Sequence, residues 1–225
     1  MSTTHFTIVP LEQGSAAWLE WRGQGIGASD APIVMGESPF MSAEELLREK
    51  RVSFKRDLVH DFGQNSTFEQ GLVHDFGQDT VFEQGLVHDF GQKSAMALGT
   101  ELEPVARKLY IAQTGREVRP VCLQSTRYEW LRASLDGLAI NHDAVVEIKC
   151  GRSAYRIAAQ TRSVPTYYYG QVQHILAVTG LDALDFWCYW PGYPPVLIPV
   201  PRDASYIVRL LNTEREFWTR VQRNI

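Results

Sequence analysis

Apolar side chains recur at helical spacing in the second half of the chain. Between residues 94 and 114, the spacing predicts one long helix that Gly115 ends, with Pro104 near its start or at a kink. Similar patterns predict helices over 166–179 and 202–223. The apolar positions of the first helix are 98, 102, 105, 106, 109 and 112.

Three shorter helices are indicated near the N-terminus by capping signals. The first covers 15–22 and has a serine as its N-cap. A second lies between about Ser29 and Gly36, with a proline in its first turn. The third opens with the capping box Ser-Ala-Glu-Glu at Ser42 and runs to about Lys50.

Runs rich in β-branched and aromatic residues predict five strands between these helices. They cover 117–124, 130–135, 144–150, 183–190 and 196–200. Strands that alternate with helices in this order predict an α/β fold with a central mixed sheet flanked by helices. We expect residues 1–225 to form a single domain, because this length suits one sizeable core.

A tandem repeat interrupts this domain at about 59–92. Val-His-Asp-Phe-Gly-Gln occurs three times with a period of 14 residues, which is shorter than most solenoid repeats. Its glycines disfavour a helix, so we expect turns, short hairpins or a surface excursion. The copied His60, His74 and His88 suggest a metal site, but simple duplication of one His-Asp pair is the favoured interpretation.

Composition restricts the class of protein only in part. The content of 44% hydrophobic and 21% charged residues is ordinary for a globular protein. Three scattered cysteines favour a reducing compartment and disfavour a disulfide framework or an iron–sulfur cluster. No signal peptide or membrane span is indicated, so we expect a cytoplasmic protein. The net charge of −4 disfavours a passive DNA-coating protein and does not exclude a nuclease.

Candidate catalytic residues lie on the second and third predicted strands. Asp136 follows Arg-Ala-Ser-Leu, and the Asp-Gly pair is expected to end the second strand. Glu147 and Lys149 lie within Val-Val-Glu-Ile-Lys-Cys on the third. This is the PD-(D/E)xK nuclease pattern, with Leu135 in place of the proline. Taken alone, such a short motif is also typical of a solvated strand and a turn, but apolar neighbours at 145, 146 and 148 favour a buried strand.

These residue types suit metal-assisted hydrolysis of a phosphodiester. Asp136 and Glu147 can ligate Mg²⁺ or Mn²⁺, and the backbone carbonyl of Ile148 can add a further ligand. Because residues 147 and 149 share one face of a strand, Lys149 is expected beside Glu147. A bound cation there should lower the pKa of Lys149, which would then position or deprotonate the attacking water.

Two further polar side chains are candidates for the same site. Glu103, on the helix before the strands, can reach a metal directly or through water, although a surface charge is the simpler interpretation. Gln171 and Gln173 lie on a predicted core helix, where buried amides require polar partners, although solvent or caps could also satisfy them.

Four blocks of sequence together resemble the phage lambda exonuclease family, also called the YqaJ-like viral recombinase group. These blocks run in the family's order from about residue 18 to 190. The tandem repeat and Leu135 depart from the family pattern. The blocks are Trp21–Arg22 with Ile26-Gly-Ala-Ser29-Asp30, Gly99-Thr-Glu-Leu-Glu103-Pro-Val-Ala106, Ser134-Leu-Asp136-Gly137 with Glu147-Ile-Lys149-Cys150, and Gly170-Gln171-Val-Gln173.

The resemblance implies a restriction-endonuclease-like core and a Mg²⁺-dependent exonuclease, with Mn²⁺ able to substitute. Such an enzyme degrades one strand of linear double-stranded DNA from its 5′ end and leaves a 3′ overhang. The resemblance also implies a homotrimer that encloses the DNA, and a single-strand annealing protein as partner.

The resemblance also assigns roles by position. Asp136, Glu147 and Glu103 would be metal or water ligands, Lys149 the catalytic lysine, and Gln171 a support of the active site. A separate group, Arg22, Ser29 and Ser134, would form a 5′-phosphate pocket, and a guanidinium with hydroxyl groups suits a terminal phosphate.

Two other functions remain open from the sequence. A structure-specific or restriction-type endonuclease can share the same fold, although no separate basic DNA-reading domain is evident. A catalytically inactive subunit of a recombination complex is also conceivable, although the retention of Asp136, Glu147 and Lys149 argues against it.

Overall fold

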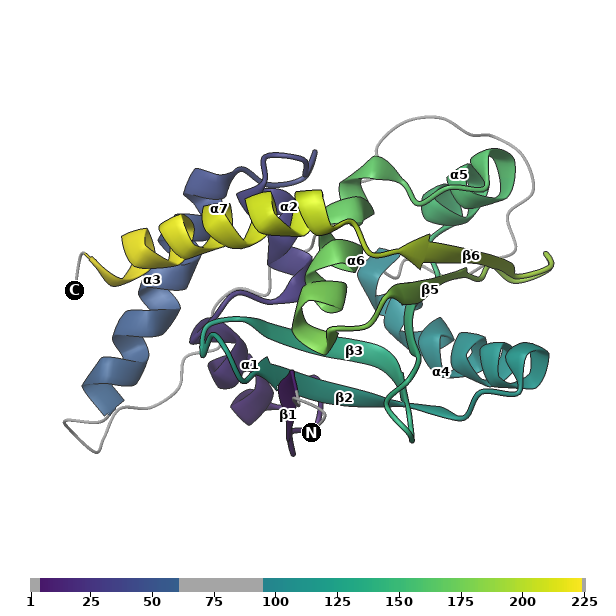
Figure 1. Ribbon diagram of the computed structural model, residues 1–225, viewed down its shortest axis with the longest axis horizontal. Helices are drawn as coiled ribbons and strands as arrows, with labels where there is room; N and C mark the ends of the chain where they lie inside the picture. The colour runs from purple at the N-terminus through teal and green to yellow at the C-terminus, as the bar shows by residue number, and fades with distance from the viewer. Residues whose placement is uncertain (1–4, 61–94, 224–225) are drawn as a thin grey trace.

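A six-stranded mixed sheet forms the centre of the computed structural model, which describes residues 5–60 and 95–223 (Figure 1). The strands lie in the order β1-β2-β3-β4-β5-β6, and β4 and β5 are parallel while every other neighbouring pair is antiparallel. The strands are β1 (Phe6–Val9), β2 (Val118–Ser125), β3 (Arg132–Ala139), β4 (Val145–Lys149), β5 (Ala183–Cys188) and β6 (Val196–Pro201).

Helices cover both faces of this sheet and extend beyond its edge. The helices are α1 (Ala16–Gly23), the 3-10 turn η1 (Ala28–Asp30), α2 (Ala31–Val34), α3 (Ala43–His60), α4 (Ala95–Thr114), α5 (Arg152–Thr161), α6 (Thr166–Thr179) and α7 (Ala204–Gln222). Figure 1 shows α7 running beside α2 and α3, away from the strands. This arrangement confirms the expected α/β fold with a central mixed sheet.

Alternation along β4 directs its side chains to two different cores. Val146 and Ile148 pack with Ala106 and Tyr110 of α4 on one face. Val145 faces the other core, where Val172, Ile175 and Leu176 of α6 are buried. Because successive side chains of a strand point to opposite faces, Glu147 and Lys149 lie on the α6 side.

The observed elements differ from the sequence prediction in four places. β1 and α5 were not predicted. α3 extends well past Lys50 to His60, and beyond Lys50 its Phe54 ring meets the Trp218 ring of α7 edge to face. The expected end of a strand at Asp136–Gly137 was wrong, since β3 continues to Ala139.

Gly137 explains why the strand can continue through this dipeptide. It pairs with Val146 across β3 and β4, and a Cβ added to it would lie 2.6 Å from a methyl of Val146 and 2.9 Å from a methyl of Val118. Real Cβ atoms do not approach other atoms so closely, so glycine is required here by packing and not by a turn.

Most of the tandem repeat lies outside the described residues. The expectation of turns or hairpins over 59–92 therefore stays a prediction, and so does the interpretation that its repeated histidines reflect simple duplication. Within the described residues, no helix combines the length and apolar character that crossing a bilayer requires.

Candidate active site

Asp136 and Glu147 lie on neighbouring antiparallel strands in the middle of the sheet. Asp136 projects from β3, and its Oδ2 accepts a hydrogen bond of 2.7 Å from the backbone N–H of Ile148 on β4. This bond links the side chain of Asp136 to the strand that carries Glu147 and Lys149. The structure therefore brings the predicted motif together in one place.

Glu147 is the most deeply buried member of this group, with 2% of its surface exposed. Its Oε1 accepts hydrogen bonds from Lys149 Nζ at 2.7 Å and from Gln171 Nε2 at 2.6 Å. Its Oε2 is buried and has no hydrogen-bond partner. An unpartnered carboxylate oxygen is costly in a protein interior, and such exceptions commonly mark a functional group or a bound ion.

The carboxyl groups around Glu147 resist ionisation together. Burial, and then the charge of Asp136, raise the pKa of Glu147 to about 8 against the opposing effect of Lys149. Burial likewise raises the pKa of Asp136. Burial and the Asp136 charge raise the pKa of Glu103 to about 7. Three acids with raised pKa values in one place would all be stabilised as anions by an added positive charge.

Lys149 is held between Glu147 and an aromatic ring. Its Nζ lies 4.5 Å from the centroid of Tyr168 on α6, a cation–π distance. Burial alone would lower the pKa of Lys149, but Glu147, Tyr168 and Asp136 together raise it above its usual value. The lowered pKa expected from the sequence depended on a bound cation. In the protein alone the direction is the opposite, and Lys149 is an ammonium at neutral pH.

Glu103 extends from α4 toward Asp136, and its carboxylate also forms an ion pair with an arginine of the same helix. Glu103 Oε1 forms an ion pair with Arg107 Nη2, one helical turn away. Arg107 also donates from Nε to the backbone carbonyl of Asp136 at 2.7 Å. Arg107 was not predicted as a site residue, and its spacing of four from Glu103 was the available signal.

Arg22, Ser29 and Ser134 line the same cavity of about 560 Å³ as the carboxylates. Arg22 Nη2 donates to Ser29 Oγ at 2.8 Å, and the Arg22 guanidinium lies 4.7 Å from the centroid of the Trp18 ring. The Trp18 indole N–H donates to Ser134 Oγ at 2.8 Å. Trp18 therefore connects the three side chains, and it too was missed, because the sequence assigned it only to a helix.

Gln173 does not belong to this site, in contrast to Gln171. Its Nε2 donates to the carbonyl of Pro201 at 3.0 Å, and its Oε1 accepts from the N–H of Asp203 at 2.9 Å. The sequence expectation that the buried amides have polar partners is therefore confirmed for both, but only Gln171 contacts the acidic group.

The donor set around Glu147 fits a hard divalent cation of the Mg²⁺ type. Within residues 5–60 and 95–223, no group of three or more His, Cys, Asp or Glu side chains is arranged to hold a metal alone. Mg²⁺ does not require one, since it commonly binds through one or two carboxylates and keeps waters and substrate oxygens as its other ligands. Asp136 and Glu147, with the unpartnered Oε2 of Glu147, provide such a pair.

Comparison with known sequences gives one family and one curated relative. A family model, the YqaJ-like viral recombinase domain, matches residues 17–182. The uncharacterized protein YqaJ of Bacillus subtilis (strain 168) is 27% identical over 218 residues, which cover 92% of this chain and 56% of YqaJ. The chain thus spans about half the length of the curated relative that it matches.

Comparison with solved structures confirms the expected core. The alkaline exonuclease LHK-Exo of Laribacter hongkongensis is similar with a TM-score of 0.70 and 22% identity, over 92% of this chain and 93% of LHK-Exo. The complex of LHK-Exo with dAMP matches to the same extent. At this identity the similarity establishes a shared restriction-endonuclease-like fold. The family model covers well over half of the chain, and we conclude that this protein belongs to the YqaJ-like viral recombinase family.

Proposed function

We propose that this protein is a Mg²⁺-dependent 5′→3′ exonuclease that acts on linear double-stranded DNA and leaves a 3′ overhang. One observation carries the proposal: a single cavity contains both the Asp136–Glu147–Lys149 group and the Arg22–Ser29–Ser134 group. The first group suits hydrolysis of a phosphodiester, and the second suits a terminal phosphate. A site that holds a strand end beside the cleavage group favours cutting from that end.

Lys149 is proposed to act on the attacking water as a fixed cation. The Lys149 ammonium, held 2.7 Å from Glu147 Oε1, can orient a water molecule and stabilise negative charge on the phosphate. Glu147 Oε1 accepts a hydrogen bond from the ammonium and holds it in place, and a hydrogen bond from Gln171 Nε2 fixes Glu147 in turn. A bound Mg²⁺ would supply Lewis-acid stabilisation of the scissile phosphate and the leaving oxygen.

Family membership and fold support the proposals for the product, the oligomeric state and the partner protein. The complex of LHK-Exo with dAMP agrees with a mononucleotide as product. We also propose a homotrimer around the DNA and a single-strand annealing protein as partner, both from the family resemblance.

A panel of DNA substrates tests the proposed activity. Linear duplex with a 5′-phosphate, linear duplex with a 5′-hydroxyl and covalently closed circular duplex are each incubated with Mg²⁺ and with EDTA. We expect mononucleotides from the linear substrates alone, in Mg²⁺ alone, and faster from the 5′-phosphoryl end. Cleavage of closed circles would favour the endonuclease alternative. Absence of cleavage with every divalent metal would favour the inactive subunit.

Replacement of Arg22 by alanine should remove the preference for a 5′-phosphate. The guanidinium supplies the charge-assisted hydrogen bonds of the proposed pocket, and each such bond contributes roughly 1.5–3 kcal/mol. We therefore expect the ratio of initial rates on phosphoryl and hydroxyl ends to fall by roughly tenfold or more. An unchanged ratio would exclude Arg22 from phosphate recognition.

A further inference from the structure

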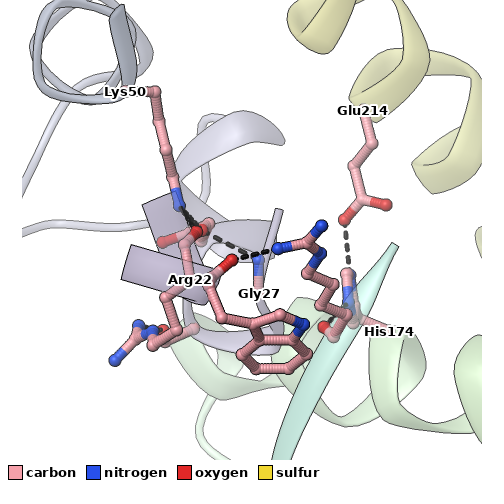
Figure 2. A network of polar contacts seen from close by, with 9 residues as sticks. Arg22, Gly27, Lys50, His174 and Glu214 are labelled. Atoms are coloured by element: carbon pink, nitrogen blue, oxygen red, sulfur yellow. Dashed lines mark hydrogen bonds and ion pairs between the residues drawn. The ribbon is translucent and has the colours of Figure 1, made fainter. Parts of the chain in front are cut away.

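Lys50 is a buried lysine that contacts the two segments carrying Arg22 and Ser29 of the proposed phosphate pocket. Lys50 on α3 has a side chain that is 9% exposed, and its Nζ lies 2.7 Å from Oδ2 of Asp30. The same Nζ donates to the backbone carbonyl of Arg22 at 3.1 Å. Asp30 directly follows Ser29, and Figure 2 shows the Lys50 side chain pointing toward Arg22. One ammonium group therefore contacts both the residue after Ser29 and the backbone of Arg22.

Asp30 fixes the turn that presents Ser29. In addition to the ion pair with Lys50, its Oδ2 accepts a hydrogen bond of 2.9 Å from the N–H of Gly27 (Figure 2). This bond closes the Gly27–Asp30 segment on itself, and Ser29 Oγ then accepts from Arg22 Nη2 at 2.8 Å. The orientation of Ser29 thus depends on a carboxylate that Lys50 neutralises.

A second buried cation reinforces the end of α1. Arg132 on β3 donates from Nη1 to the carbonyl of Trp21, the residue before Arg22. The last carbonyls of a helix lack partners within the helix, and cations there also match its dipole. Arg132 and Ser134 are two residues apart on β3, so the strand that holds Ser134 is tied to the helix that holds Arg22.

The C-terminal helix holds this strand in turn. His174 on α6 lies 2.8 Å from the carbonyl of Arg132 through Nε2 and 2.7 Å from Glu214 of α7 through Nδ1 (Figure 2). Because a carbonyl can only accept, Nε2 of His174 carries the proton. Contacts from α3, α6 and α7 therefore converge on the back of the pocket, and within this network Lys50 alone contacts both the Arg22 backbone and the segment that carries Ser29.

We propose that Lys50 is a positioning residue that sets the distance between Arg22 and Ser29 and thereby sets the affinity for a 5′-phosphate. The inference rests on the proposed function. A buried ion pair is weak evidence for a role in stability, because desolvation offsets most of the attraction. The Lys50–Asp30 ion pair instead fixes the relative positions of Arg22 and Ser29, and a misplacement of about 1 Å in a binding group can cost roughly 100-fold in rate.

Two variants separate positioning from stability. Lys50→Met keeps the length of the side chain but leaves the Asp30 carboxylate buried and unpaired, so this variant is expected to melt at a lower temperature. The double variant Lys50→Met with Asp30→Asn removes both charges, and the asparagine oxygen can still accept from Gly27. The double variant should recover much of the melting temperature that Lys50→Met alone loses. It still lacks the hydrogen bond to the backbone carbonyl of Arg22. Lys108→Met, at an exposed lysine on α4, is the matched control.

Binding and cleavage of defined duplexes give the decisive measurements. Anisotropy in EDTA measures the affinity for a duplex with a 5′-phosphoryl or a 5′-hydroxyl end, and initial rates in Mg²⁺ are measured on the same pair. We expect wild type and Lys108→Met to prefer the phosphoryl end. The double variant should lose roughly tenfold or more of that preference, while its rate on the hydroxyl end stays within about twofold of wild type.

Three results would overturn the inference in distinguishable ways. If the folded double variant keeps the wild-type preference, Lys50 does not position the pocket, while the proposed exonuclease stands. If wild type itself does not distinguish the two ends, the phosphate pocket fails, and the role of Lys50 fails with it. If the double variant loses the rate on both ends equally, Lys50 supports the fold in general and not this pocket.

Discussion

Replacing Lys149 with alanine is expected to lower the rate of DNA cleavage by roughly 100- to 10,000-fold. The ammonium is the cation that the structure places on Glu147 Oε1, at 2.7 Å, inside the cavity. Without it, neither the attacking water nor the developing charge on the phosphate has a fixed partner at this position. Initial rates on a linear 5′-phosphoryl duplex in Mg²⁺ measure the effect.

Binding should survive this substitution, because the phosphate pocket is built from other residues. Affinity for the same duplex in EDTA is expected to stay within about threefold of wild type, which is less than 1 kcal/mol. The fold should also survive, since the raised pKa of Glu147 lets its carboxyl take up a proton when the ammonium is lost. Lys108→Ala on α4 is the matched control. Turnover like that of wild type would exclude Lys149 from catalysis.

Hydrophobic patterning predicted five of the six strands and the long helices α4, α6 and α7. The apolar run around Glu147 predicted a buried strand, and Val145, Val146 and Ile148 are indeed 1%, 0% and 5% exposed. Because a buried strand alternates its faces, the proximity of Glu147 and Lys149 followed from sequence alone. The site was predictable to the extent that it depends on this local periodicity.

Features that depend on distant packing were not predictable in the same way. Asp-Gly usually marks a turn, and only the methyl groups of Val146 and Val118 show why Gly137 continues a strand. Beyond Lys50, α3 contacts α7 at Arg51 and Phe54, and no local signal in the sequence reports these contacts. The four-residue strand β1 is short, and only pairing with β2 establishes it.

Long-range contacts also decide the electrostatics of the site. The sequence places an acid at 103 and an arginine at 107, but it does not show that Arg107 binds the carbonyl of Asp136. Nor does it show that Glu147 has one oxygen with two donors and another with none. The lowered pKa of Lys149 that is expected with a bound cation stays a prediction, while in the protein alone the charges of Glu147, Tyr168 and Asp136 raise this pKa.

The stability of the metal-free protein should fall as pH rises from about 5 to about 9. The pKa of Glu147 is raised in the folded state to about 8, and that of Glu103 to about 7, so both bind a proton more tightly when folded than when unfolded. Their contribution is complete below the unfolded pKa and is lost as pH rises through the folded value. Glu147 contributes more of this loss than Glu103, because its pKa is raised further by burial.

Mg²⁺ should reverse this loss, because a cation binds the ionised carboxylates of the folded state. Melting temperatures in EDTA and in Mg²⁺ are therefore expected to differ most near about pH 9 and least near about pH 5. The same curves measured with Ca²⁺ test whether the effect belongs to the site or to one metal. A melting temperature that does not change with pH in EDTA would contradict the burial of an ionisable carboxyl group at this position.

Glu147→Gln assigns the effect to this one carboxyl group. The amide keeps an oxygen for Lys149 and Gln171 but removes the charge that repels Asp136. We expect the melting temperature of the variant in EDTA to fall less than that of wild type between about pH 5 and about pH 9. The variant should also gain little from Mg²⁺ and lose cleavage by roughly 100-fold or more. Glu216→Gln, at an exposed glutamate on α7, is the matched control. A variant that still gains stability from Mg²⁺ as wild type does would show that Glu147 is not a ligand. A gain in stability together with a loss of activity would show that the Glu147 carboxylate destabilises the fold and is kept because catalysis requires it.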